Sequence, residues 1–186
     1  MLNLLRHGET DANAAGRSHG LTCDHHLNAT GLAQAAIVGR KLKHIRFDAI
    51  YTSTRIRAVE MAEAINIWLD YPVEPIIEPL LIGRDLGSLT GKLFHELTAE
   101  QLQAVNTPDN KYGVETTEHF RQRISVFLKN PELKDHNSLI ISHGHTILEM
   151  LKMFDEEKIR MSGIRRNSNS NTIVMPKNCD IVNVEY

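Results

Sequence analysis

The sequence predicts an α/β fold, a three-layer α/β/α arrangement with a mainly parallel central sheet. Short apolar runs, typical of buried strands, alternate along the chain with longer segments in which apolar residues recur every three or four positions, as in helices. This alternation favours a parallel sheet with helices on both faces, because each strand returns through a crossover helix. The chain has 186 residues and no repeat or linker, so we expect residues 1–186 to form a single domain.

The first half of the chain supplies three predicted strands and two helices. The apolar run Leu2–Leu5 opens the chain as a buried strand, and residues 11–27, rich in small and polar groups, are expected to be a long loop. Small and apolar residues recur at helical spacing from Asn28, and either Asn28 or Thr30 can cap this helix. The remaining predicted elements are a strand at 47–53, a helix at 55–68 that ends before Pro72, and a short edge strand at 73–77.

The second half continues the alternation after an irregular, glycine-containing stretch at 78–92. A helix at 93–105, a turn at 107–110 and a helix at 115–128 that ends before Pro131 come next. A buried strand at 138–142 follows, and a helix at 147–154 comes directly after it. Residues 160–171 are polar and predict a loop, and the final two strands are expected at 172–175 and 180–185.

The composition excludes several classes of protein. Formal net charge is −2, which gives no electrostatic case for binding to nucleic acid or to a membrane surface. The two cysteines, Cys23 and Cys179, form no metal-binding or disulfide pattern and favour a reducing, cytoplasmic setting. No stretch resembles a signal peptide or a membrane span, and we expect no cleaved leader because the first strand begins at residue 2.

Three predicted strands carry unusual polar groups at their carboxyl ends. The first strand ends in Arg6 and His7, and the second gives Ser53 with Arg57 one helical turn onward. The late strand ends in His143 and Gly144. Because ligands of open α/β sheets bind beyond the carboxyl ends of the strands, we expect these groups to share one concave site for an oxyanion.

Two guanidinium groups and two imidazoles suit a phosphoryl group better than a carboxylate, which one guanidinium satisfies. The sequence contains no P-loop and no acidic metal-binding cluster. We therefore expect metal-free phosphoryl transfer without a cofactor, through a covalent intermediate on histidine. His143-Gly144-His145 leaves a metal hydrolase as an alternative, and His19, His25 and His26 are interpreted as surface residues rather than metal ligands.

Several of these motifs resemble those of the histidine phosphatase superfamily, in its phosphoglycerate-mutase-like branch. The opening Arg6-His7-Gly8-Glu9-Thr10 looks like the signature of this family, and the resemblance extends through nearly the whole chain. The other matching positions are Asn13, Gly20, Leu27, Gly31, Gln34-Ala35, Tyr51-Thr52-Ser53, Arg57-Ala58, Ala62-Glu63, Gly87, Gly91, Glu115, Arg123 and Ser142-His143-Gly144.

The resemblance implies a phosphoglycerate-mutase-like fold and a role for each site residue. His7 would attack phosphorus, and Arg6, Arg57 and a cationic His143 would hold the phosphoryl oxygens. Asn13 and the backbone amide of Gly144 would complete the phosphate pocket. We expect His19 and Gly20 to contact the substrate, and His19, Leu21 and residues 83–112 to line the entrance and set specificity.

One position departs from the family. Where the family usually has a glutamate that protonates the leaving group, this chain has Gly83. Asp85 is the candidate acid in its place, although it also fits a solvated loop carboxylate or a partner of Arg84, and Glu78 is a more distant candidate. Alternatively, the substrate has a good leaving group and needs no acid.

The sequence therefore predicts a phosphomonoesterase that acts on a small phosphorylated substrate through a phosphohistidine on His7. A mutase is less favoured, because it must return the phosphoryl group with acid–base help that Gly83 does not give. The alternative from another class is a weak or inactive member of the family that only binds a phosphorylated ligand.

Overall fold

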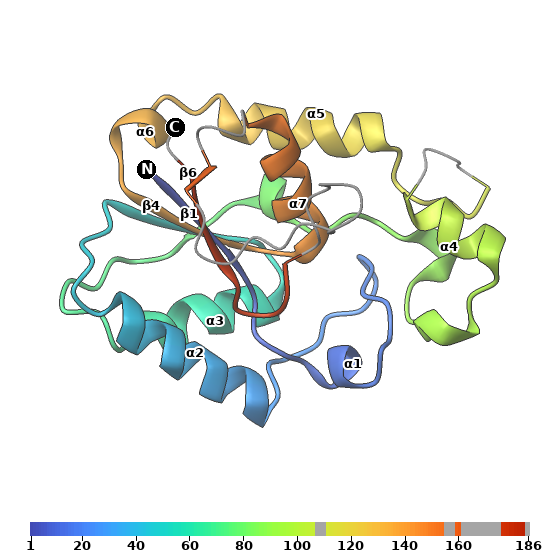
Figure 1. Ribbon diagram of the computed structural model, residues 1–186, viewed down its shortest axis with the longest axis horizontal. Coiled ribbons are helices and arrows are strands. Elements are labelled where there is room, and N and C mark those ends of the chain that lie inside the picture. Colours follow the sequence, from blue (N-terminus) through green and yellow to red (C-terminus); the bar gives the residue numbers. More distant parts are fainter. Residues whose placement is uncertain (107–110, 155–158, 161–175, 185–186) are drawn as a thin grey trace.

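The computed structural model describes residues 1–106, 111–154, 159–160 and 176–184, and its centre is a six-stranded sheet within those residues (Figure 1). The strand order is β3-β2-β4-β1-β6-β5. Parallel pairing joins β1 to β4, β4 to β2 and β2 to β3, whereas β6 is antiparallel to both β1 and β5. The strands are β1 (Leu2–Arg6), β2 (Ala49–Thr52), β3 (Ile76–Ile77), β4 (Ser138–Ser142), β5 (Ile159–Arg160) and β6 (Ile181–Val184).

Helices cover both faces of this sheet (Figure 1). One face packs against α2 (Ala29–Leu42) and α3 (Ile56–Asn66). The other packs against α5 (Thr117–Leu128), α6 (Glu132–Asp135) and α7 (Gly144–Met153). Successive side chains of the central strands point alternately into the two cores: Leu4 and Ile140 belong to one core, and Leu5 and Ile141 belong to the other. The predicted three-layer α/β/α fold with a mainly parallel sheet is confirmed.

The remaining elements lie beyond the carboxyl ends of the strands. They comprise α1 (Asp11–Ala14), α4 (Ala99–Asn106) and three short 3₁₀ turns, η1 (Pro79–Leu81), η2 (Gly87–Leu89) and η3 (Phe94–Glu96). A separate small apolar cluster, which includes Leu86, Leu89 and Val105, holds the segment around α4 together. This segment forms one side of the cavity described below.

The observed elements differ from the predicted ones mainly at short segments. The predicted loop 11–27 contains α1, because Thr10 and Asn13 form a capping box that stabilises a single turn of helix. The structure also adds α6, starts α4 at Ala99 instead of residue 93 and starts α7 at Gly144 instead of residue 147. The predicted strand at 172–175 and most of the predicted loop at 160–171 lie outside the described residues.

No helix in the described part of the chain combines the length and the apolar character needed to cross a membrane.

Candidate active site

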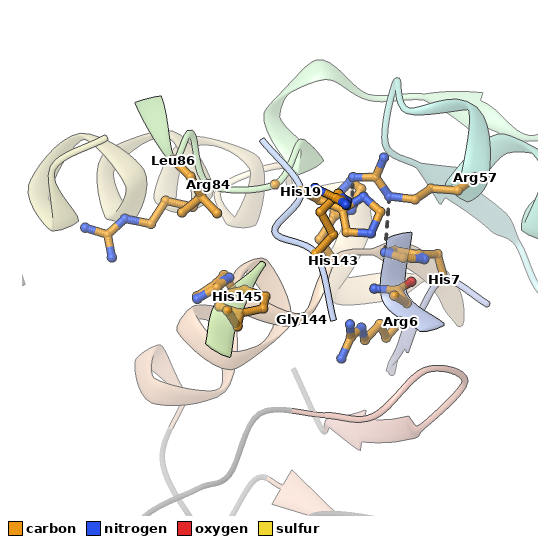
Figure 2. A pocket seen from close by; sticks show the side chains of 13 residues that line it. Arg6, His7, His19, Arg57, Arg84, Leu86, His143, Gly144 and His145 are labelled. Carbon is orange, nitrogen blue, oxygen red and sulfur yellow. Dashed lines mark hydrogen bonds between the residues drawn. The ribbon is translucent and has the colours of Figure 1, made fainter. Parts of the chain in front are cut away.

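The sheet topology brings the three polar strand ends together. Because β4 lies between β1 and β2 and all three run parallel, their carboxyl ends meet at one edge. Arg6 ends β1 and His7 follows it, while His143 is the residue that precedes α7. Arg57 lies in the first turn of α3, directly after β2. The expectation that these four residues share one concave site agrees with the geometry (Figure 2).

A small cavity of about 110 Å³ lies between these side chains. Among the described residues that line it there is no aspartate or glutamate, and eight of them are arginine or histidine. Such a lining favours an anionic ligand. The lining residues are Arg6, His7, Asn13, Arg17, His19, Arg57, Gly83, Arg84, Leu86, Phe94, His143, Gly144 and His145.

The two nitrogens of His7 have different roles. Nδ1 lies 2.7 Å from the carbonyl oxygen of Gly8, which only accepts, so Nδ1 carries the ring proton and donates it. Nε2 accepts a hydrogen bond from Nε of Arg57 at 3.2 Å. Burial and the nearby charges of Arg57 and Arg6 lower the pKa of His7 well below 6.5. His7 is therefore a neutral imidazole. The lone pair on its Nε2 is directed at Nε of Arg57, and both residues line the cavity.

His143 is connected to His7 through Arg57. Nη2 of Arg57 donates to Nδ1 of His143 at 3.2 Å, and Nε2 of His143 donates to Oγ of the buried Ser53 at 2.8 Å. The centres of the two imidazole rings are 5.2 Å apart. Burial, Arg57 and His7 lower the pKa of His143 well below 6.5. In this arrangement His143 is neutral, which differs from the cationic form expected from the sequence, because its Nδ1 accepts the Arg57 hydrogen bond.

The two arginines differ in how fully their donors are engaged. Burial lowers the pKa of Arg57 to about 10, and Asp24, whose Oδ1 lies 3.5 Å from Nη1, partly opposes this shift. Arg6 donates from Nη1 to the carbonyl oxygen of Pro176 at 2.7 Å. Within the described structure, Nε of Arg6 is buried and forms no hydrogen bond, whereas Nη1 of Arg57, also without a hydrogen bond, faces the carboxylate of Asp24. Because buried donors in folded proteins are nearly always satisfied, the unpaired Nε of Arg6 favours an anionic ligand at this place.

Three of the four predicted substrate-binding residues line the cavity. Asn13, His19 and Gly144 line the cavity, and the Gly144 amide belongs to the first turn of α7, where backbone N–H groups point outward. Burial and Arg57 lower the pKa of His19 to about 3, so this imidazole is neutral too. Gly20 does not line the cavity, and its predicted contact with substrate is not supported. It packs against Thr90, whose Oγ1 would lie 1.8 Å from a Cβ atom at position 20.

Gly83 forms part of the cavity wall beside His143. A Cβ atom at position 83 would lie 3.3 Å from Cγ of His143, which is a tight contact. Side chains from α5, α7 and β4 donate hydrogen bonds to the backbone of residues 81–83. Ser142 Oγ donates to Leu81 O, Thr146 Oγ1 to Ile82 O, and Nη2 of Arg123 to Gly83 O.

Neither candidate acid reaches the cavity. Asp85 is absent from its lining, and the carboxylate Oδ1 of Asp85 accepts the backbone N–H of Gly87 at 3.0 Å. Glu78 instead caps the 3₁₀ turn η1 by accepting from Leu80 N. The acid role predicted for Asp85 therefore has no geometric support in this structure, because the carboxylate is engaged within its own loop.

Sequence reasoning missed other residues of the cavity. Arg17 lines it from a segment with no recognisable motif, whereas Phe94 and Arg84 lie in the stretch 83–112 that is expected at the entrance; the guanidinium of Arg84 points away from His7 (Figure 2). His145, which the sequence suggests only as a metal ligand, lines the cavity as a buried imidazole whose pKa burial lowers to about 4. Leu21 does not line the cavity, and within 83–112 only Gly83, Arg84, Leu86 and Phe94 do so among the described residues.

No group of three or more histidine, cysteine, aspartate or glutamate side chains in the described ranges is arranged to hold a metal ion. His19 and His25 pack edge to face, with ring centres 5.3 Å apart, rather than converging on a common point with a third ligand.

Comparison with known proteins gives concordant matches. The model of the histidine phosphatase superfamily (branch 1) matches residues 2–179. The chain is 36% identical over 151 residues to the uncharacterised phosphatase PhoE of Bacillus subtilis, covering 80% of this chain and 74% of that protein. It is 34% identical to the fructose-2,6-bisphosphatase TIGAR B of Danio rerio, covering 76% of this chain and 58% of the relative. A crystal structure of phosphoglycerate mutase from Thermus thermophilus superimposes with a TM-score of 0.65 at 27% identity, covering 94% of this chain and 88% of that one.

Proposed function

This chain belongs to the histidine phosphatase superfamily, and we propose that it hydrolyses a small phosphomonoester through a phosphohistidine intermediate on His7. The observation that carries the proposal is the state of His7. Its Nε2 is unprotonated and borders a cavity whose described lining contains arginines and histidines but no carboxylate. A neutral imidazole nitrogen beside the guanidinium groups of Arg6 and Arg57 is suited to attack on a phosphoryl group.

The reaction has two steps. The lone pair of His7 Nε2 attacks phosphorus while the bond from phosphorus to the leaving oxygen breaks. Arg6 and Arg57 stabilise the phosphoryl oxygens. Water then attacks phosphorus, the bond from phosphorus to Nε2 breaks, and inorganic phosphate leaves. The proton that the water loses balances the one that the leaving oxygen takes up.

His143 and Gly144 support the same phosphoryl group. The Gly144 amide at the start of α7 donates a backbone hydrogen bond to an oxygen. When a phosphoryl dianion draws the Arg57 donors toward itself, Nδ1 of His143 is released from Arg57 and can take up a proton. His143 therefore reaches its cationic form only with the anion bound.

Hydrolysis of p-nitrophenyl phosphate tests the proposal. We expect His7→Ala to lower kcat by about a thousandfold or more, because the nucleophile is lost. His44→Ala, at an exposed histidine paired with Asp70, serves as the matched control and keeps wild-type activity. Rapid quenching of the wild type with labelled substrate should trap a phosphoryl group that is stable to base and labile to acid. Unchanged turnover in His7→Ala would remove His7 from the reaction.

The same assay tests metal independence. Activity that persists undiminished after exhaustive chelation supports the metal-free route that we propose, and activity that chelator abolishes and zinc restores would contradict it.

A second candidate function is the binding of a phosphorylated ligand without turnover. Gly83, which has no side chain, and the absence of a described carboxylate from the cavity lining favour it. A wild-type protein that binds inorganic phosphate, yet neither hydrolyses aryl phosphates nor becomes labelled, would establish this alternative.

A further inference from the structure

The turn that precedes β6 lies against the loop that carries His7. Because β6 pairs antiparallel with β1, the residues before Ile181 lie beside the carboxyl end of β1. Two backbone hydrogen bonds join them, from Cys179 N to Arg6 O at 3.1 Å and from Arg6 N to Asp180 O at 3.4 Å. The side chain of Asn178, which is 171 residues from His7 along the chain, thereby reaches the candidate active site.

The amide nitrogen of Asn178 has three acceptors. Its Nδ2 lies 2.9 Å from His7 O, 3.0 Å from Gly8 O and 3.3 Å from Oδ1 of Asn13. All three are oxygens that accept, so the two hydrogens of Nδ2 are shared among them. The first two contacts fix the orientation of two consecutive carbonyl groups that follow β1.

One of these carbonyls, together with the Arg57 donor at Nε2, sets the protonation pattern of His7. Gly8 O accepts both from Nδ2 of Asn178 and from Nδ1 of His7. The peptide group that follows Gly8 has no Cβ atom at residue 8 to restrict its rotation, so side chains hold it at both ends: its N–H, from Glu9, donates to Oε1 of Gln34 at 2.9 Å, and its oxygen accepts from Asn178. If this oxygen turned away, the ring could carry its proton on Nε2, and the nucleophilic lone pair would be lost.

We infer that Asn178 is a positioning residue: through the Gly8 carbonyl it keeps the ring proton of His7 on Nδ1 and leaves Nε2 free to attack phosphorus. It also affects Asn13, whose Oδ1 accepts from Asn178 and from Thr10 N. With Oδ1 engaged in this way, the Nδ2 group of Asn13 remains to face the cavity as a donor. The inference rests on the proposed function only in giving Nε2 the role of nucleophile.

Nitrogen-15 NMR of histidine-labelled protein tests the positioning role without any need for turnover. Protonated and unprotonated ring nitrogens have well-separated chemical shifts, and the His7 signals are identified as those missing from His7→Ala. We expect the wild type at pH 7 to carry the proton on Nδ1. In Asn178→Asp, which keeps the shape but replaces the donor by an acceptor, the Nε2-protonated form should appear.

Kinetics on p-nitrophenyl phosphate provide the second readout. Asn178→Ala and Asn178→Asp should lower kcat by about 10- to 100-fold, because a misplaced nucleophile costs rate rather than binding. For Asn178→Ala we expect less than about a threefold change in KM, since Arg6 and Arg57 remain. Asn178→Gln retains an amide donor and should recover part of the rate. Lys177→Ala, at the exposed neighbour in the same turn, is the matched control and should behave as wild type.

The outcomes separate the two proposals. Folded Asn178 variants that keep the wild-type protonation of His7 overturn the positioning role, whatever happens to kcat. A wild type without turnover contradicts the proposed function, while the NMR comparison still decides the role of Asn178. If Asn178→Ala does not fold, Asn178→Asp and Asn178→Gln carry the same comparison.

Discussion

At the scale of single residues, Arg57 connects the candidate catalytic groups. Its guanidinium donates from Nε to His7 and from Nη2 to His143, and its Nη1 faces Asp24. Only a planar group with several donors satisfies this geometry, because the lysine ammonium is a single point of charge. A residue that bridges two imidazoles in this way keeps both of them neutral until an anion competes for the same donors.

Gly83 gives a prediction at this scale. Gly83→Glu places a carboxyl group at the cavity wall, and we expect it to raise kcat/KM for an alkyl phosphate at least tenfold relative to an aryl phosphate. The reason is that proton donation to a poor leaving group contributes about a hundredfold or more. The measurement is the ratio of the two kcat/KM values.

Gly83→Ala is the matched control for this substitution. It adds the Cβ atom that would lie 3.3 Å from Cγ of His143 but supplies no acid, so the ratio should stay at the wild-type value. An equal change in the ratio for both variants would assign the effect to crowding of His143.

At the scale of elements, the irregular stretch 80–85 is held in place by the helices around it. Arg123 of α5 donates to the carbonyls of Leu80 and Gly83 and forms an ion pair with Glu115. Glu115 in turn accepts from Asp85 N, so this pair of charged residues restrains the segment at three backbone groups. Beyond the turn η1, this stretch therefore owes its position to contacts with Arg123 and Glu115.

Arg123→Met tests this restraint. It keeps much of the aliphatic stem but removes the bonds to two carbonyls and to Glu115, so we expect the free energy of unfolding to fall by about 2 kcal/mol. Urea denaturation measures the change. Gln122→Met, at an exposed position on the same helix, should change stability by less than about 0.5 kcal/mol. Equal stabilities for the two variants would show that the loop does not depend on Arg123.

The start of α2 gives a second prediction for an element. A Cβ atom at Gly31 would lie 2.2 Å from Glu9 O, because α2 packs directly on the backbone that follows His7 and Gly8. Helix propensity alone would make Gly31→Ala stabilising by about 1 kcal/mol. We expect the opposite sign, with a loss of about 2 kcal/mol in urea denaturation, because a rigid backbone contact must open.

The matched control for Gly31→Ala reverses the substitution at an exposed position of the same helix. Ala33→Gly should lose only about 1 kcal/mol, the amount expected from propensity. A stabilising Gly31→Ala would contradict the close contact.

At the scale of the whole molecule, the cavity gathers cationic and imidazole groups from segments that are far apart in the chain. His7, His19, His143 and His145 all have pKa values lowered by burial and by neighbouring arginines. All four are neutral in the folded protein near pH 7, whereas in the unfolded chain each has a pKa of about 6.5. Folding thus keeps these imidazoles unprotonated.

Stability should therefore fall as the solution is acidified. Below pH 6.5 these four histidines bind protons in the unfolded chain but stay unprotonated in the folded protein. The free energy of unfolding therefore decreases with falling pH. Each such histidine contributes at most about 1.4 kcal/mol per pH unit between its unfolded and folded pKa values. Urea denaturation between pH 7 and 5 measures the slope.

His145→Asn checks the source of this slope. Removing one of the four imidazoles with a lowered pKa should reduce the change in the free energy of unfolding per pH unit. His44→Ala, at an exposed histidine, should leave the contribution of the cavity histidines unchanged. A slope that does not respond to His145→Asn would place the acid sensitivity elsewhere in the protein.

The amino-acid sequence by itself determined the α/β fold, the order of the central strands along the chain and the residues at their ends. Arg6, His7, Arg57 and His143 were predictable because apolar strands with polar carboxyl ends are local patterns, and a parallel sheet places such ends together. The family followed from the same motifs.

Only the tertiary structure decided how the groups around those four residues act. Asp85, predicted as the acid, turns its carboxylate to Gly87 N, and Gly83 packs beside His143 instead. The contact of Asn178 with Gly8 and the proton on Nδ1 of His7 depend on which backbone oxygens face which side chains. Hydrogen-bond direction across residues distant in the chain is set by packing in three dimensions, and no local pattern of residues encodes it.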